Sequence, residues 1–132
     1  ILNRPYPSAL LSRYSWHVRR PLDTALMAEA SGYFIGEKNF ASFMAAGSDA
    51  LHSIREVTAI TIAEKGDGLI EIEFKGTAFL RNMVRIMTGT LAAVGKGKIK
   101  PLDMPAIIEA RARAAAFTTA PPGGLFLVKV EY

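Results

Sequence analysis

An alternation of apolar and charged residues near the middle of the chain constrains its fold more than any other feature. In residues 70–75, three apolar side chains alternate with three charged ones, and residues 58–62 also alternate. The sequence Lys65-Gly66-Asp67-Gly68 between the two runs is typical of a turn. Successive side chains of a strand point to opposite faces, so we predict an antiparallel hairpin with one buried and one solvent-facing side.

Three segments have the apolar spacing of helices. The first begins at Pro21 and Asp23 and ends at Gly36. The second runs from about Leu80 to Val94, and the third from about Met104 to Ala115. The apolar stripe of the second helix is predicted to consist of Leu80, Met83, Val84, Met87, Leu91 and Val94.

The two ends of the chain read as strands. Residues 1–3 resemble the end of a strand, which suggests a piece of a longer protein, and residues 125–130 read as a buried strand. Strands mixed with helices and joined by a hairpin predict an α+β fold, with a mixed, mainly antiparallel sheet packed against helices. A length of 132 residues, half of them apolar, fits one domain with one core.

The composition excludes several kinds of site. The chain has no cysteine, so it holds neither a disulfide nor a thiolate metal site, and this fits a cytoplasmic location. Its two histidines, His17 and His52, are not at metal-ligand spacing, so no metal site is indicated. No apolar run approaches the ~18–20 residues of a membrane span, and no nucleotide-type glycine loop is present.

The charge of the chain favours an anionic partner. Sixteen Lys and Arg against twelve Asp and Glu give a net charge of +4. Residues 95–98 (Gly-Lys-Gly-Lys) carry part of this charge directly after the second predicted helix. They allow two interpretations, a loop that wraps a phosphate or a soluble helix terminus.

One face of the second predicted helix carries two arginines. Arg81 and Arg85 lie four residues apart, and Gly89 continues the same face one turn later. A glycine there costs roughly 1 kcal/mol of helix propensity, and such a residue often indicates close packing against the backbone. Two interpretations stay open. The arginines are exposed beside a tolerated glycine, or they form a cationic face directed at a phosphate, a carboxylate or a partner chain.

Seven stretches, in order and covering nearly the whole chain, carry a resemblance to a known family. They are Asn3-Arg4-Pro5 with Ala9-Leu10-Leu11, Trp16-His17-Val18, Pro21-Leu22-Asp23, Gly36-Glu37 with Phe40-Ala41-Ser42-Phe43, Ser53-Ile54-Arg55-Glu56-Val57, Phe79-Leu80-Arg81-Asn82-Met83-Val84-Arg85 with Gly89-Thr90-Leu91 and Val94-Gly95, and Thr119-Ala120-Pro121-Pro122-Gly123-Gly124-Leu125. In this order and spacing they are similar to the tRNA pseudouridine synthase A family.

The resemblance implies the C-terminal half of an isomerase with the pseudouridine synthase fold. Such an enzyme converts uridine to pseudouridine in the anticodon arm of tRNA, without a metal or an organic cofactor, and it is usually a homodimer. An aspartate in a Gly-Arg-Thr-Asp-Ala-Gly motif attacks the flipped nucleotide. The four aspartates of this chain, Asp23, Asp49, Asp67 and Asp103, lie in no such motif. We therefore expect residues 1–132 to be a C-terminal α/β domain that is inactive without its N-terminal domain.

The resemblance also assigns site residues. Arg85 matches the arginine of the family's Met-Val-Arg motif, which implies that it supports the aspartate of the missing domain. The residues expected to bind RNA are Arg4, His17, Val18, Gly47, Ser48, Asp49, Ala50, Leu51, Arg55 and Arg81.

The chain departs from the family's pattern near its C-terminal end. It has Ala112-Arg113 where the family often has Asp-Arg, and residues 116–119 (Ala-Phe-Thr-Thr) where the family often has Ala-Gly-Pro-Thr. A phenylalanine in place of glycine fills space in that loop. Two other functions stay open: a stand-alone RNA-binding or dimerisation module without catalysis, and a structural domain whose charge only confers solubility.

Overall fold

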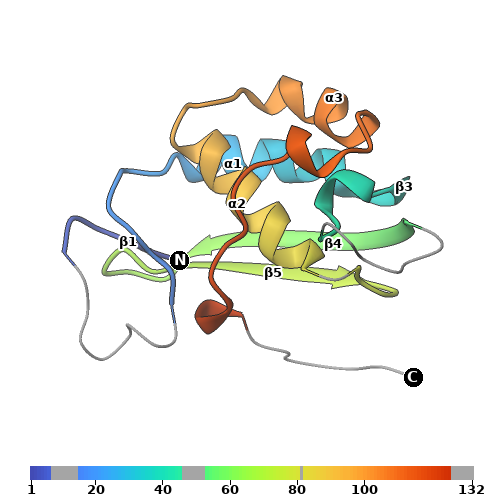
Figure 1. Cartoon of the computed structure of the whole chain (residues 1–132). Helices are drawn as coiled ribbons and strands as arrows, with labels where there is room; N and C mark the ends of the chain where they lie inside the picture. The colour runs from blue at the N-terminus through green and yellow to red at the C-terminus, as the bar shows by residue number, and fades with distance from the viewer. Residues whose placement is uncertain (7–14, 46–52, 81, 126–132) are drawn as a thin grey trace.

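The computed structural model describes residues 1–6, 15–45, 53–80 and 82–125, and its centre is a three-stranded antiparallel sheet. The strands are β3 (Gly36–Asn39), β4 (Ile54–Glu64) and β5 (Ile70–Gly76), in the order β3-β4-β5. The helices lie on one face of this sheet (Figure 1). The predicted α+β fold is therefore confirmed.

The predicted hairpin is formed by β4 and β5. Ile62 pairs with Ile72 and Ile60 with Phe74, and these four side chains pack against the core. The neighbouring Glu71, Glu73 and Lys75 of β5 are exposed. In the turn, Gly66 and Gly68 have φ angles of 91° and 81°, which glycine adopts without steric cost. Strand β4 is longer than the predicted run, and a bulge interrupts its pairing between Val57 and Ala59.

Strand β3 was not predicted, because its sequence Gly-Glu-Lys-Asn has no alternation of apolar and polar residues. It is an edge strand in which Lys38 pairs with Arg55 and Asn39 with Ile54 of β4. The predicted end of the first helix at Gly36 agrees with the start of this strand, since Gly36 has a φ of 111°. The pairing that creates β3 comes from the neighbouring strand and not from its own sequence.

Helix α1 (Thr24–Ser31) begins where it was predicted to begin. The Oδ1 atom of Asp23 accepts hydrogen bonds from the backbone N–H groups of Ala25 and Leu26, at 3.1 and 3.2 Å. Such an N-cap contributes about 1 kcal/mol to helix stability. A 3₁₀ turn (Gly32–Phe34) continues the helix towards β3.

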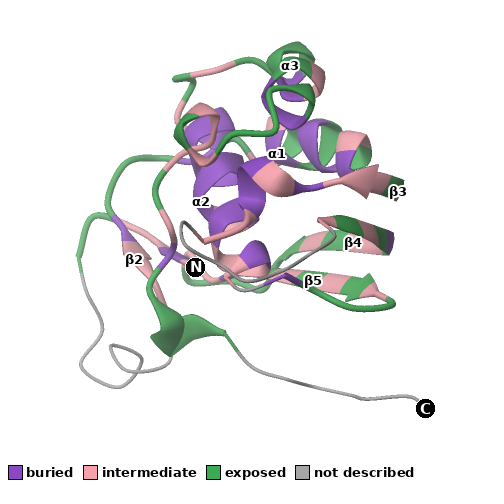
Figure 2. Ribbon diagram, turned by 45° about the vertical axis from the view of Figure 1, so that its right-hand side comes forward, coloured by how far each residue is buried: buried purple, intermediate pink, exposed green. Residues whose placement is uncertain are grey.

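Helix α2 (Met83–Gly95) is the most buried element of the described chain, as Figure 2 shows. It begins three residues later than predicted, because Asn82 has a left-handed backbone with φ of 61°. The predicted stripe is largely confirmed, but Val84 is only partly buried and Ile86, which was left out, is fully buried. Val84 lies at the edge of the stripe that faces the core.

Helix α3 (Met104–Glu109) is shorter than predicted, and it lies farther from the sheet than α1 and α2 (Figure 1). Ile107 and Ile108 are buried, as their spacing indicates. The extension to Ala115 was wrong because Arg111 has a φ of 50°, which an α-helix cannot accommodate. A separate 3₁₀ turn (Arg113–Ala115) follows.

A short parallel pair joins the N-terminal segment to the end of the sheet. Strands β1 (Leu2–Asn3) and β2 (His17–Val18) pair with each other, and Ile1 exchanges backbone hydrogen bonds of 2.7 and 2.8 Å with Ile70 of β5. The predicted antiparallel sheet is therefore confirmed, and the parallel pair forms a separate two-stranded sheet beside it. Of the predicted strand 125–130, only Leu125 is described. It lies in no strand and is exposed. The other residues of this prediction lie outside the described part of the chain.

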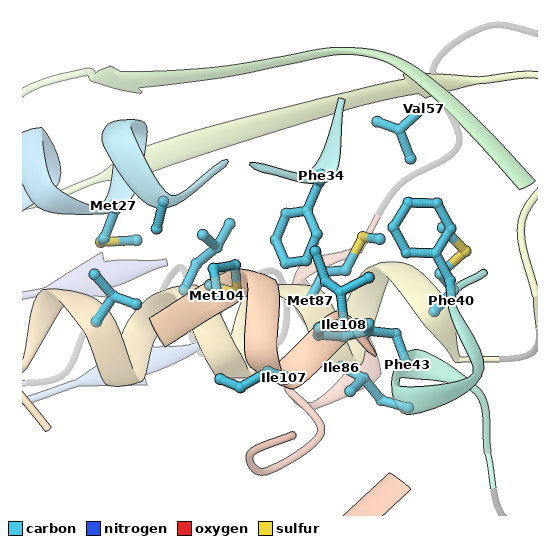
Figure 3. Close-up of a cluster of buried hydrophobic side chains, with 14 of the residues drawn as sticks. Met27, Phe34, Phe40, Phe43, Val57, Ile86, Met87, Met104, Ile107 and Ile108 are labelled. Carbon is cyan, nitrogen blue, oxygen red and sulfur yellow. The ribbon is translucent and has the colours of Figure 1, made fainter. Parts of the chain in front are cut away.

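The core lies between the sheet and the helices (Figure 3). Its centre is three aromatic rings, of which Phe34 and Phe43 meet edge to face with centroids 5.0 Å apart. The 3₁₀ turn Ala41–Phe43 supplies one of these rings. The side chains that surround the rings include Met27, Val57, Ile86, Met87, Met104 and Ile108.

Truncation of an aromatic ring should destabilise this core. Phe43→Ala is expected to lower the free energy of unfolding by about 3–5 kcal/mol, because it leaves a cavity among fully buried side chains. Urea unfolding followed by circular dichroism measures the change. Leu102→Ala is the matched control, since Leu102 is 73% exposed, and its effect should stay within about 0.5 kcal/mol. Equal effects of the two substitutions would contradict the described packing.

Candidate functional site

The side chain of Arg85 is held in place on the first turn of α2. Its Nε–H donates to the backbone carbonyl of Ala120 at 2.8 Å, and one of its terminal nitrogens donates to Oδ1 of Asn82 at 3.2 Å. The backbone N–H of Ala120 donates in return to the carbonyl of Arg85 at 2.9 Å. A guanidinium has five N–H donors, so three remain for another group in the described structure. Arg85 is partly buried, which restricts its orientation.

Residues 117–120, called the strap below, lie along the same face of α2 (Figure 1). An ideal Cβ atom on Gly89 would collide with the carbonyl oxygen of Thr118. At the next residue of the helix, the backbone N–H of Phe117 donates to the Thr90 hydroxyl at 3.2 Å. The close backbone packing that Gly89 indicated is therefore confirmed. The backbone of the strap is what lies against this glycine.

Buried hydroxyl groups connect the strap and the segment before it to the core. The Thr90 hydroxyl donates to the carbonyl of Ile86 at 3.0 Å while it accepts from Phe117. The Ser42 hydroxyl donates to the carbonyl of Ile107 at 2.6 Å and accepts from the N–H of Ala112 at 3.2 Å. Both hydroxyls are fully buried, so their hydrogen bonds are costly to break. Sequence reasoning missed both, although a threonine inside an apolar stripe was the available signal.

Three of the predicted RNA-binding residues, Arg4, His17 and Val18, lie together at the β1 end of the sheet. The Nε2 atom of His17 shares a hydrogen bond of 2.8 Å with the carbonyl of Arg4. The Arg4 guanidinium donates to the carbonyl of Tyr6 at 3.1 Å and lies 4.5 Å from the centre of its ring. Val18 is only 5% exposed, and its carbonyl accepts from the Asn3 side chain at 3.0 Å, so little of this residue is open to RNA in the described structure.

The other predicted RNA-binding residues are not brought to this place. Arg55 lies near the start of β4, whereas β1 meets the sheet beside Ile70, which pairs with Glu64 at the end of β4. Nine residues of strand separate these ends, which is about 30 Å. Gly47, Ser48, Asp49, Ala50, Leu51 and Arg81 lie outside the residues that the structure describes.

Two cavities open on the described surface. The larger, of about 310 Å³, lies between β3 and α3 and is lined by Tyr33, Lys38, Asn39, Pro105, Ile108, Glu109 and Arg111. The smaller, of about 110 Å³, lies beside the strap and is lined by Trp16, Gly89, Ala93, Lys96, Lys98, Phe117 and Thr118. Phe117, the residue that replaces the family's glycine, thus forms part of a cavity wall and also packs against the core.

Neither a metal cluster nor a membrane-spanning helix is found in the described ranges. No three His, Asp or Glu side chains there are grouped so that they could hold a metal ion. No helix there is both long and apolar enough to cross a membrane.

A sequence model described as tRNA pseudouridine synthase matches residues 30–132 of the chain. The chain belongs to the tRNA pseudouridine synthase family. The resemblance predicted from the seven stretches is thus confirmed, and the matched residues include α2, Gly89, Arg85 and the strap.

Curated relatives give the same result over the whole chain. The tRNA pseudouridine synthase A of Acetivibrio thermocellus is 45% identical over 132 residues, which are all of this chain and 54% of the relative. That of Ruminiclostridium cellulolyticum is 43% identical over the same share of both chains. That of Geobacter sulfurreducens is 44% identical over 125 residues, or 95% of this chain and 51% of the relative. The chain spans about half the length of these curated relatives.

The contact between Gly89 and the strap can be tested by adding one methyl group. Alanine normally stabilises a helix by about 1 kcal/mol relative to glycine. Gly89→Ala is instead expected to lower the free energy of unfolding by about 1–3 kcal/mol, because the Cβ atom must displace the Thr118 carbonyl. Thr88→Ala, one residue away and partly exposed, should have little effect. A stabilising Gly89→Ala in urea unfolding would show that the strap does not lie there.

Proposed function

We propose that the chain is the C-terminal part of a tRNA pseudouridine synthase that isomerises uridine in the anticodon arm of tRNA. The observation that carries this proposal is the fixed position of the Arg85 guanidinium. Arg85 lies within the residues of this chain that match the family. The strap and Asn82 together use two of its donors and leave three for an anionic group. In this proposal that group is the catalytic aspartate of the N-terminal half.

The proposed role of Arg85 is to position that aspartate and keep it ionised. A guanidinium within ion-pair distance lowers the pKa of a carboxyl group, so the carboxylate stays charged for attack on the flipped uridine. The C–N glycosidic bond then breaks, and a C–C bond between the same sugar and base replaces it. Because the Nε–H bond to Ala120 fixes the plane of the guanidinium, the carboxylate is offered one orientation.

The roles of the described aspartates are consistent with a nucleophile that comes from the N-terminal half. Asp23 caps α1, and Oδ2 of Asp103 accepts from the backbone N–H of Lys100 at 2.8 Å. Asp67 lies in the β4–β5 turn with a φ of 52°, and its carbonyl accepts from Arg4. Each of the three has a place in local structure, and none contacts Arg85 in the described chain.

An assay on unmodified tRNA tests the proposal. The chain alone should form no pseudouridine, and addition of an N-terminal half that carries the Gly-Arg-Thr-Asp motif should produce it. In the mixture, Arg85→Ala is expected to lower the rate about 100-fold, because the carboxylate loses its orientation. Arg111→Ala, which removes an exposed arginine that follows α3, should keep the rate.

Two results would contradict the proposal. Pseudouridine formed by the chain alone would mean that the nucleophile lies within it. If the two folded halves bind each other and tRNA but form no pseudouridine, the result would favour a binding module without catalysis. The homodimer implied by the family resemblance stays a prediction, and sedimentation of the joined halves would check it.

A further inference from the structure

Three cations gather at the C-terminal end of α2, at the opposite end of the helix from Arg85. The ammonium of Lys96 lies 5.9 Å from the centre of the Trp16 ring. Burial lowers the pKa of Lys96, and the charges of Lys98 and Arg20 lower it further. Lys96 is thus partly removed from water while its nearest charged neighbours repel it. An anion bound here would offset the repulsion and favour the charged form of Lys96.

The adjoining cavity has room for a small anion. Its volume of about 110 Å³ corresponds to roughly three or four water molecules. Trp16 and Phe117 form apolar walls, and Lys96 and Lys98 are its only charged lining residues in the described structure. No carboxylate there forms an ion pair with Arg20, Lys96 or Lys98. Within residues 1–6, 15–45, 53–80 and 82–125, this positive charge is therefore uncompensated.

The lysines are not required to cap the helix. The carbonyls of the last turn accept backbone N–H groups, from Lys96 to Ala92 at 2.9 Å, and from Lys98 to Ala93 at 3.0 Å. Gly97, with a φ of 80°, makes this turn possible. Because backbone N–H groups already bond to these carbonyls at the end of the helix, the lysine ammonium groups are available to a ligand.

We propose that Lys96, Lys98 and Arg20, beside Trp16, bind a backbone phosphate of the RNA substrate. This rests on the proposed function and adds a second contact to it. Along α2, Arg85, Gly89, Ala93 and Lys96 follow each other at spacings of four, four and three residues, so they share one face. Arg85 and Lys96 lie about 16 Å apart along the helix axis. A stem whose uridine reaches Arg85 is long enough to place its backbone at Lys96, because even in double-stranded DNA, where a strand rises about 3.4 Å per nucleotide, a few nucleotides cover this distance.

Trp16 is the only tryptophan of the chain, so its fluorescence reports on this place. Titration of the chain with an anticodon-arm stem–loop should change the emission of Trp16. The double variant Lys96→Gln, Lys98→Gln is expected to abolish that change and to weaken binding about tenfold near 0.1 M salt. The slope of log K against log salt should fall by about one to two, since each lost phosphate contact removes close to one ion.

The matched control is Lys38→Gln, Arg111→Gln, which removes the same charge from the larger cavity. It should keep the affinity, the salt slope and the response of Trp16. If the double variant at residues 96 and 98 fails to fold, the single variant Lys98→Gln replaces it in the test, because Lys98 is exposed. Lys98→Gln is expected to lower the salt slope by about one.

Three results would overturn the proposal. The first is unchanged RNA affinity and salt slope in the folded Lys96 and Lys98 variants. The second is a Trp16 response to inorganic phosphate with none to the stem–loop, which would indicate a free anion site. The third is a response to poly-glutamate that exceeds the response to RNA. These are binding measurements, so a failed pseudouridine assay with intact RNA binding at Lys96 would reject the catalytic proposal alone.

Discussion

The contact between the strap and the backbone of α2 at Gly89 determines where Arg85 can lie. The Thr118 carbonyl rests in the space that a side chain at residue 89 would occupy. This contact places Ala120 beside Arg85, where the two residues exchange a backbone and a side-chain hydrogen bond. Without it, the guanidinium would keep only the bond to Asn82 and would regain its rotamer freedom. A glycine without a side chain thus fixes a charged group one turn away.

The rest of the fold supplies a rigid support for that contact. Helix α2 is buried between the sheet and the other helices (Figures 1 and 2). Its residues Ile86, Met87 and Leu91 lie in the core. The same helix presents Arg85 and Gly89 to the strap. The Thr90 hydroxyl links the two sides, because it bonds to Ile86 within the helix and to Phe117 of the strap. Displacement of the strap would leave this buried hydroxyl short of a partner, which is unfavourable.

Sequence patterns predicted the elements that depend on neighbouring residues. They failed for the elements whose conformation depends on contacts with distant segments or on a single backbone angle. The β4–β5 hairpin was predictable because alternation and a glycine turn lie within a few residues. Strand β3 was not, since only its pairing with β4 makes it a strand. The start of α2 depends on the left-handed Asn82, and the end of α3 on Arg111. At the site, Gly89 indicated a close contact, but its partner lies 29 residues away at Thr118, beyond the reach of helical spacing. The importance of Arg85 came from the family resemblance, whereas its bond to Ala120 is visible only in the structure.

Hydrogen exchange of the Arg85 Nε–H measures most directly whether the strap holds the guanidinium in place. In a nitrogen–proton correlation spectrum, the Nε–H of Arg85 should exchange slowly with water, because it donates to a carbonyl in a partly buried place. The Nε–H of Arg111, which is exposed, is the internal comparison. Slow exchange at Arg85 that becomes fast in Gly89→Ala is the result that this account predicts. Exchange at Arg85 as fast as at Arg111 would contradict it.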